Sequence, residues 1–170
     1  MKKLFLVLIV LALAVTAVLP AFAQGRPGPT IVDTAIAANT SGPYAGQFDI
    51  LIAALLAADP SIIATLSGPG QFTVFAPTDD AFAAAGITSL PPQNVLNAVL
   101  TYHVAPGRRA ANAVTRMSQI NTLNGQFIRV SGTVLTDANG RSMNIIVPDI
   151  AASNGIIHVI DNVLLPAESD

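Results

Sequence analysis

The sequence has no cysteine, and nearly all of it lacks lysine. Without cysteine, disulfides, thiol catalysis and thiolate metal sites are excluded, so stability must come from a packed core. Lys2 and Lys3 are the only lysines, which excludes a Schiff-base lysine in the rest of the chain. Beyond residue 23, six arginines stand against ten acidic residues, a net charge of −4. Such a surface argues against nucleic acid as a partner, because phosphate binding needs a dense basic face.

The first 23 residues have the pattern of an export signal. Lys2 and Lys3 precede an apolar run that ends at Pro20, and Ala21-Phe22-Ala23 suits cleavage after a small residue. The run is short for a membrane anchor and no stop-transfer pattern follows it. We therefore expect a signal peptide over 1–23 cleaved after Ala23, a linker over 24–29, one domain over 30–166 and a polar tail over 167–170. The mature chain would have no membrane span and would be secreted, extracellular or periplasmic.

Helical patterns dominate the first half of the predicted domain. Thr30 followed by Asp33 resembles a capping box, which predicts a helix start. Apolar residues recur at helical spacing in two further segments, which predicts two helices with buried stripes. These stripes are Phe48, Leu51, Ile52, Leu55 and Leu56 in the first, and Val95, Leu96, Val99 and Leu100 in the second.

The second half changes to a strand pattern. Asn-Gly occurs at 124–125, 139–140 and 154–155, and this dipeptide tolerates the positive φ angles of tight hairpin turns. Short β-branched runs flank these turns at 120–123, 127–130, 144–147 and 156–160. A further buried strand is predicted over 72–75. Helices followed by an antiparallel meander predict an α+β domain.

Two segments, TVFAPTDDAF at 73–82 and SNGIIHVIDNVLLP at 153–166, resemble the signature blocks of the fasciclin domain family. The Tyr102-His103 pair between them matches the central tyrosine-histidine of that family, and the resemblance extends from about Thr30 to Pro166. It implies a β-wedge or sandwich of short, mostly antiparallel strands with a helical layer packed on it. It also implies a binding and adhesion module rather than an enzyme, with no cofactor and no metal.

The resemblance suggests contact residues for adhesion. In animal fasciclin domains a tyrosine-histidine stretch flanked by aliphatic residues has been linked to adhesion, which makes Tyr102 and His103 candidates here. Asp149 and Ile150 match the centre of an integrin-recognition motif in some animal members. Each pair has a structural alternative: a buried tyrosine and histidine, and a turn at a strand end.

Arg108 and Arg109, with Arg116 nearby, form the only basic cluster in the sequence. They fit either a solvated face or a site for acidic polysaccharide. The remaining motif residues are expected to define the fold. Thr78 and Asp79 suit a helix N-terminus, Asn154 and Gly155 a turn, His158 a hydrogen-bonded position among isoleucines, and Asp161 the end of a strand.

The sequence therefore predicts a secreted or cell-surface fasciclin-domain protein that acts in cell adhesion or matrix binding without catalysis. Its partner would be a protein or polysaccharide of the matrix or cell surface, and self-association is possible. One alternative is a carrier of a small apolar ligand, in a cavity near Val95, Val99 and Tyr102. A hydrolase is a third hypothesis, which requires His103 or His158 to be exposed beside a serine or aspartate.

Overall fold

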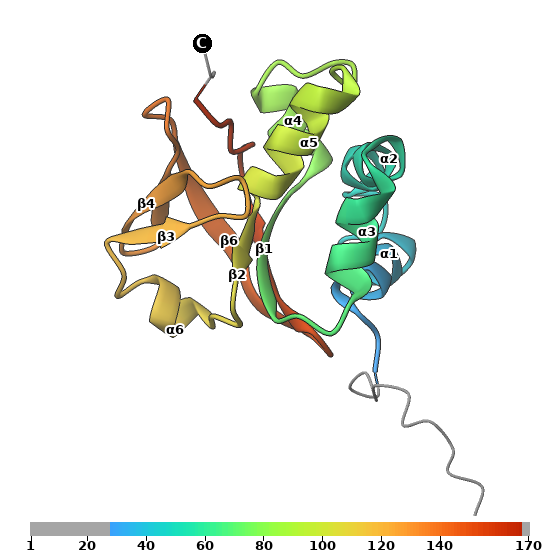
Figure 1. Cartoon of the computed structure of the whole chain (residues 1–170), viewed down its shortest axis with the longest axis horizontal. Helices are drawn as coiled ribbons and strands as arrows, with labels where there is room; N and C mark the ends of the chain where they lie inside the picture. The colour runs from blue at the N-terminus through green and yellow to red at the C-terminus, as the bar shows by residue number, and fades with distance from the viewer. Residues whose placement is uncertain (1–27, 168–170) are drawn as a thin grey trace, which may run out of the picture.

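The computed structural model describes residues 28–167. The expected signal peptide, its cleavage site, the linker up to residue 27 and the tail from residue 168 lie outside the described residues. Figure 1 shows an α+β fold in which helices α1–α3 lie on one side of strand β1 and the hairpin strands lie on the other. The elements are α1 (Ile31–Thr40), α2 (Asp49–Ala57), α3 (Pro60–Ser67), β1 (Phe72–Pro77), α4 (Asp79–Ala84), α5 (Gln93–Tyr102), β2 (Val104–Pro106), α6 (Ala111–Val114), β3 (Gln119–Asn121), β4 (Phe127–Ser131), β5 (Val134–Thr136), β6 (Ser142–Ala152) and β7 (Gly155–Ile160).

The strands form one seven-stranded sheet in the order β2-β1-β7-β6-β5-β4-β3. All neighbours are antiparallel except β1 and β7, which run parallel from Phe72 opposite Gly155 to Pro77 opposite Ile160. These two central strands come from the two signature blocks, which therefore lie side by side. The β1–β7 pairing places the loop after β2 next to the far end of β6.

Strand β6 connects the two halves of the sheet. Its first residues pair with β5, and its later residues pair with β7 after register shifts between Ile145 and Val147 and between Val147 and Ile150. Bulges of this kind bend a strand and increase its twist. The sheet therefore folds into a wedge, with one core inside the wedge and a second core between β1, β7 and the helical layer.

Helices α1, α3 and α4 begin at residues whose side chains cap them, which are Thr30, Asp59 and Thr78. Thr30 accepts a hydrogen bond from the Asp33 amide at 3.3 Å, and the Asp33 carboxylate accepts one from the Thr30 amide at 3.0 Å. This reciprocal pair is the expected capping box. Within residues 28–167, no single helix is long and apolar enough to cross a membrane; α2 and α3 reach that length only together, and they are bent by 114°.

Three local predictions were wrong. Leu56 and Val95, expected in buried stripes, are 74% and 44% exposed. The third Asn-Gly pair is at the predicted hairpin, but the turn consists of Ser153 and Asn154, and Gly155 has no positive φ. Gly155 is instead the first residue of β7, and it lies too close to Phe72 and Ile31 for any side chain. Strand β5 was missed because it has only three residues and follows a turn at Gly132, whose φ is 62°.

Candidate functional site

Four of the six predicted contact residues lie on two adjacent segments. Arg108 and Arg109 are in the loop between β2 and α6, whereas Asp149 lies within the second register shift of β6 and Ile150 is the first paired residue after it. The Ala111 amide at the start of α6 donates to the Asp149 carboxylate at 2.8 Å, which joins the two segments directly. Arg108 and Asp149 are exposed, and Arg109 and Ile150 are half-buried. We call this four-residue patch the loop–bulge surface.

His158 lies beneath the loop–bulge surface and fixes both of its segments. The Asp149 amide donates to Nδ1 of His158 at 3.1 Å, so the ring proton resides on Nε2, which donates to the Arg109 carbonyl at 2.9 Å. The residue is fully buried in β7. Burial lowers the pKa of His158 below its usual value. A neutral imidazole therefore bridges Arg109 and Asp149, which are 49 and 9 residues from His158 in the sequence.

The backbone at Asp149 is unusual. Its φ of 62° is the one positive value for a residue other than glycine in the described chain. Asparagine and aspartate tolerate this region best among residues with a side chain. The conformation follows the β6 bulge and turns the carboxylate onto the amide of Ala111. Local strain is thus offset by two hydrogen bonds, one that the Asp149 amide donates and one that its carboxylate accepts.

Strand β1 holds the arginine loop from below. The Thr73 hydroxyl donates to the Gly107 carbonyl at 2.7 Å and accepts from the Arg109 amide at 2.9 Å. Arg108 extends across to the Ala152 carbonyl at 2.9 Å, and Arg109 reaches the Pro106 carbonyl at 3.1 Å. Sequence reasoning did not single out Thr73. The sequence does contain a pattern that points to this residue, because Thr73 is a threonine in an otherwise apolar strand. A buried hydroxyl there must form hydrogen bonds with a neighbouring segment.

Tyr102 and His103 are not on the surface, so they are withdrawn as contact residues. Tyr102 is 0% exposed. Its hydroxyl donates to the Phe127 carbonyl at 3.0 Å and accepts from the Ala138 amide at 3.0 Å, which joins β4 to the turn before β6. Burial raises the pKa of Tyr102. The tyrosine continues the buried stripe of α5 at helical spacing. It is therefore a buried structural residue, the alternative that the sequence also allowed.

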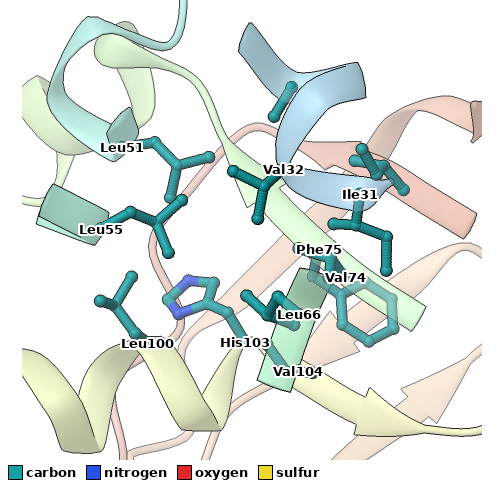
Figure 2. A pocket seen from close by; sticks show the side chains of 12 residues that line it. Ile31, Val32, Leu51, Leu55, Leu66, Val74, Phe75, Leu100, His103 and Val104 are labelled. Carbon is teal, nitrogen blue, oxygen red and sulfur yellow. The ribbon is translucent and has the colours of Figure 1, made fainter. Parts of the chain in front are cut away.

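His103 ends helix α5 and is 3% exposed. Its Nε2 accepts from the Leu164 amide at 3.0 Å, so Nδ1 carries the proton and donates to the Val99 carbonyl at 2.8 Å. Burial lowers its pKa from 6.5 to about 4. Figure 2 shows the imidazole among Leu55, Leu66 and Leu100, at the edge of an apolar cavity. His103 thus connects α5 to the segment after β7.

The apolar cavity lies between helices α1–α3 and strand β1, and not near Val95 as the carrier hypothesis expected. Its volume is about 30 Å³. Cavities that hold a molecule as small as benzene measure about 150 Å³. The cavity is therefore too small for the apolar ligand that the carrier hypothesis requires.

The two histidines do not share a cleft. Each uses both ring nitrogens on backbone groups, and neither bonds to a serine or carboxylate side chain within residues 28–167. The described residues also contain no group of three or more histidine, aspartate or glutamate side chains placed to hold a metal ion. The geometry that a histidine-dependent hydrolase requires is therefore missing from the described part of the chain.

The remaining motif residues connect elements of the fold. Thr78 caps α4 by accepting from the Ala81 amide at 3.2 Å, and Asp79 accepts from the Asp49 and Ile50 amides at the start of α2. Asp161 accepts from the backbone and side chain of Asn144 at 2.7 and 2.8 Å. The first block thus ties α4 to α2, and the second ties the end of β7 to β6.

Asn154 links the N-terminal helices to the sheet. Its side chain accepts from the Ile31 amide at 2.8 Å and donates to the Leu66 and Gly68 carbonyls at 2.6 and 3.1 Å. Its neighbour Gly155 leaves room for the close approach of β1 and α1. The asparagine was expected in a turn, but its side chain has a larger role, because it satisfies one end of each of two helices.

Comparison with known proteins agrees with this architecture. The Fasciclin domain model matches residues 46–166. The chain is 38% identical to the uncharacterised protein sll1735 of Synechocystis sp. over 81% of this chain and 98% of that protein. It is 30% identical to the cell surface glycolipoprotein MPB83 of Mycobacterium bovis, over 85% of this chain and 68% of that protein.

Among solved structures, the fold is similar to a FAS1 domain pair from the insect cell adhesion molecule Fasciclin I. The TM-score is 0.59 and the sequence identity is 22%, over 73% of this chain and 47% of that chain. The match includes the wedge-shaped sheet with its helical layer. The predicted α+β fold is thereby confirmed, and the chain belongs to the fasciclin domain family.

Proposed function

We propose that the protein is an exported, non-catalytic binding module that attaches to a protein or polysaccharide of the matrix or cell surface through the loop–bulge surface. The observation that carries this proposal is the His158 bridge, which holds Arg109 and Asp149 together with two hydrogen bonds. Arginines and an acid on two segments of backbone held together in this way suit recognition of a partner with complementary charge. The relative MPB83, a cell surface protein by name, supports the same setting.

A single domain limits the strength of attachment. Two or more linked sites raise apparent affinity because the second contact becomes intramolecular. We propose that the domain acts in many copies at the surface, by self-association or by attachment to a repeating ligand. This gain in apparent affinity does not depend on which protein or polysaccharide is bound.

The test is retention of the mature chain, residues 24–170, on immobilised cell-envelope and matrix fractions of the source cells. Asp149→Asn removes the charge but keeps an oxygen for the Ala111 amide and tolerates the positive φ. Arg108→Gln removes the cation from the same surface. We expect each change to weaken retention about fivefold, which corresponds to about 1 kcal/mol for a charged contact.

Asp80→Asn is the matched control, because Asp80 is exposed on α4 outside the loop–bulge surface. It should bind as the parent does. If Asp149→Asn and Arg108→Gln also bind as the parent does, with unchanged circular dichroism, the loop–bulge surface is not the contact site.

A further inference from the structure

The outer face of strands β3–β5 carries a row of polar side chains that is separate from the loop–bulge surface. Strand β4 alternates, with Ile128 and Val130 buried in the wedge and Phe127 and Arg129 pointing outward. Register places Gln119, Arg129, Thr136 and Ser142 in one row across β3, β4, β5 and β6. Three strand spacings make this row about 14 Å long. All four of its side chains are polar, and three are exposed.

Arg129 is the cation of this row. Its guanidinium carbon lies 5.9 Å from the centre of the Phe127 ring. Among residues 28–167, no side chain or backbone group forms a hydrogen bond or an ion pair with this guanidinium. Phe127 is 43% exposed. An aromatic ring and a guanidinium are thus presented together, on a face where the other polar groups are amides and hydroxyls.

A surface pocket of about 330 Å³ opens beside these two residues. It is lined by Gly125, Gln126, Phe127, Arg129, Asp137 and Ala138. This volume is at the lower end of the usual range for small-ligand sites. The Asp137 carboxylate is buried, is paired with Arg141 at 2.8 Å, and accepts from three backbone amides. Its charge is therefore neutralised, and Arg129 leaves the pocket with a net positive charge.

The pocket is held in shape from behind. The Tyr102 hydroxyl bonds to Phe127 and Ala138, one residue on each side of the pocket. Gln126 is fixed in turn by Ala167, because its amide nitrogen donates to the Ala167 carbonyl at 3.1 Å and its oxygen accepts from the Ala167 amide at 2.8 Å. Rigid walls reduce the ordering that binding requires.

We propose that this face binds an acidic polysaccharide, with one uronate-type sugar in the pocket. The Phe127 ring would lie against the C–H face of the sugar, and Arg129 would pair with its carboxylate. Gln119 and Thr136 would hydrogen-bond hydroxyls of neighbouring sugars along the row. A protein partner fits less well, because protein interfaces centre on several apolar and aromatic residues, whereas this face of β3–β5 presents Phe127 and the half-buried Val134 among polar side chains. The proposal goes beyond the proposed function, because it assigns a ligand class to a second surface that is separate from the loop–bulge surface.

The test is affinity electrophoresis of the mature chain, residues 24–170, in gels that contain polygalacturonate, neutral dextran or poly-L-glutamate. We expect retardation by polygalacturonate alone, and weaker retardation at 200 mM than at 50 mM salt. Arg129→Gln should weaken the affinity about tenfold and Phe127→Leu about fivefold, since one loses the charged pair and the other the aromatic face. Arg116→Gln is the control, an exposed arginine outside the pocket lining that should bind as the parent does.

Three results would overturn the proposal: no retardation by polygalacturonate, equal weakening by Arg116→Gln and Arg129→Gln, or equal retardation by poly-L-glutamate with no effect of Phe127→Leu. The last result would assign the face to acidic proteins. The envelope assay changes Asp149 and Arg108, whereas this assay changes Arg129 and Phe127. Failure of one proposal therefore leaves the result for the other standing.

Discussion

At the scale of single residues, two buried histidines act as neutral connectors. Each ring accepts a hydrogen bond from one backbone amide and donates one to a backbone carbonyl. Protonation would turn the accepting ring nitrogen into a second donor. A protonated ring could keep only one of its two hydrogen bonds. The fold therefore depends on the neutral form of both side chains.

Acid should destabilise the protein between about pH 6.5 and pH 4. In this range an unfolded chain, with an ordinary histidine pKa, takes up a proton that folded His103, with a pKa of about 4, does not. The stability from His103 is complete above pH 6.5 and falls by about 3 kcal/mol by pH 4. His158 acts in the same direction because its pKa is also lowered. Urea unfolding followed by circular dichroism at several pH values measures this loss.

The control variant for this prediction is His103→Asn, which keeps one donor near the position of Nδ1 but cannot titrate. It should be less stable than the parent at pH 7 and should lose less stability between pH 6.5 and pH 4. Asp33 and Asp59 do not confuse the result, because their pKa values are lowered below 3.8 and they titrate at lower pH. A parent whose stability is flat from pH 7 to pH 4.5 would show that His103 is not buried and neutral.

Asn154 provides a second prediction at this scale. Asn154→Ala leaves the Ile31 amide and the Leu66 and Gly68 carbonyls without their partner. We expect a loss of about 3 kcal/mol in the free energy of unfolding, because unpaired buried groups cost about 1–3 kcal/mol each and water can reach some of them. Asn112→Ala, at an exposed position in α6, should change it by less than about 0.5 kcal/mol. Equal effects of the two changes in urea unfolding would contradict the role of Asn154.

At the scale of elements, the parallel pairing of β1 with β7 determines the centre of the fold. Gly155 permits it, since a side chain there would meet the Phe72 carbonyl and, at 2.6 Å, the Ile31 side chain. Gly155→Ala should lower the free energy of unfolding by about 3 kcal/mol. Gly125→Ala should cost about 1 kcal/mol, because that residue has space but a φ of 92°. Urea midpoints of the two variants test the difference, and equal losses would contradict it.

Local sequence patterns predicted most of these elements but not how they pair. The helix starts at Thr30 and Thr78 follow from capping residues alone. By contrast, β1 and β7 are about 80 residues apart, and no local pattern encodes which strands of a meander meet. The exposure of Leu56 was also missed, because helical spacing identifies a stripe but not how far the neighbouring element covers it.

The candidate site shows the same limit. The sequence identified Arg109 and Asp149 separately, and only the fold brings them together, through a histidine expected to be structural. Tyr102 and His103 continue the apolar stripe of α5, so their burial was one of two open alternatives. The outer row from Gln119 to Ser142 depends on the register of three short strands, which the sequence does not fix.

At the scale of the whole molecule, charge is separated between the two halves. Residues 28–107 contain five aspartates and no lysine or arginine, whereas every arginine of the described chain lies between 108 and 141. The helical side is therefore acidic, and both proposed binding surfaces lie on the half that holds the arginines. A domain with this distribution should approach an anionic surface with its β-hairpin half first.

The central claim is that the protein works through its outer surface, and that the two buried histidines are structural, with His158 holding that surface and His103 holding α5 to the segment after β7. Hydrogen exchange read by mass spectrometry, on the mature chain with and without vesicles prepared from the source envelope, tests it most directly. We predict that bound vesicles slow exchange of backbone amides in residues 107–111 and 148–151, while amides near His103 in α5 exchange as before. Protection centred on residues 99–104, with none at the loop–bulge surface, would contradict the claim.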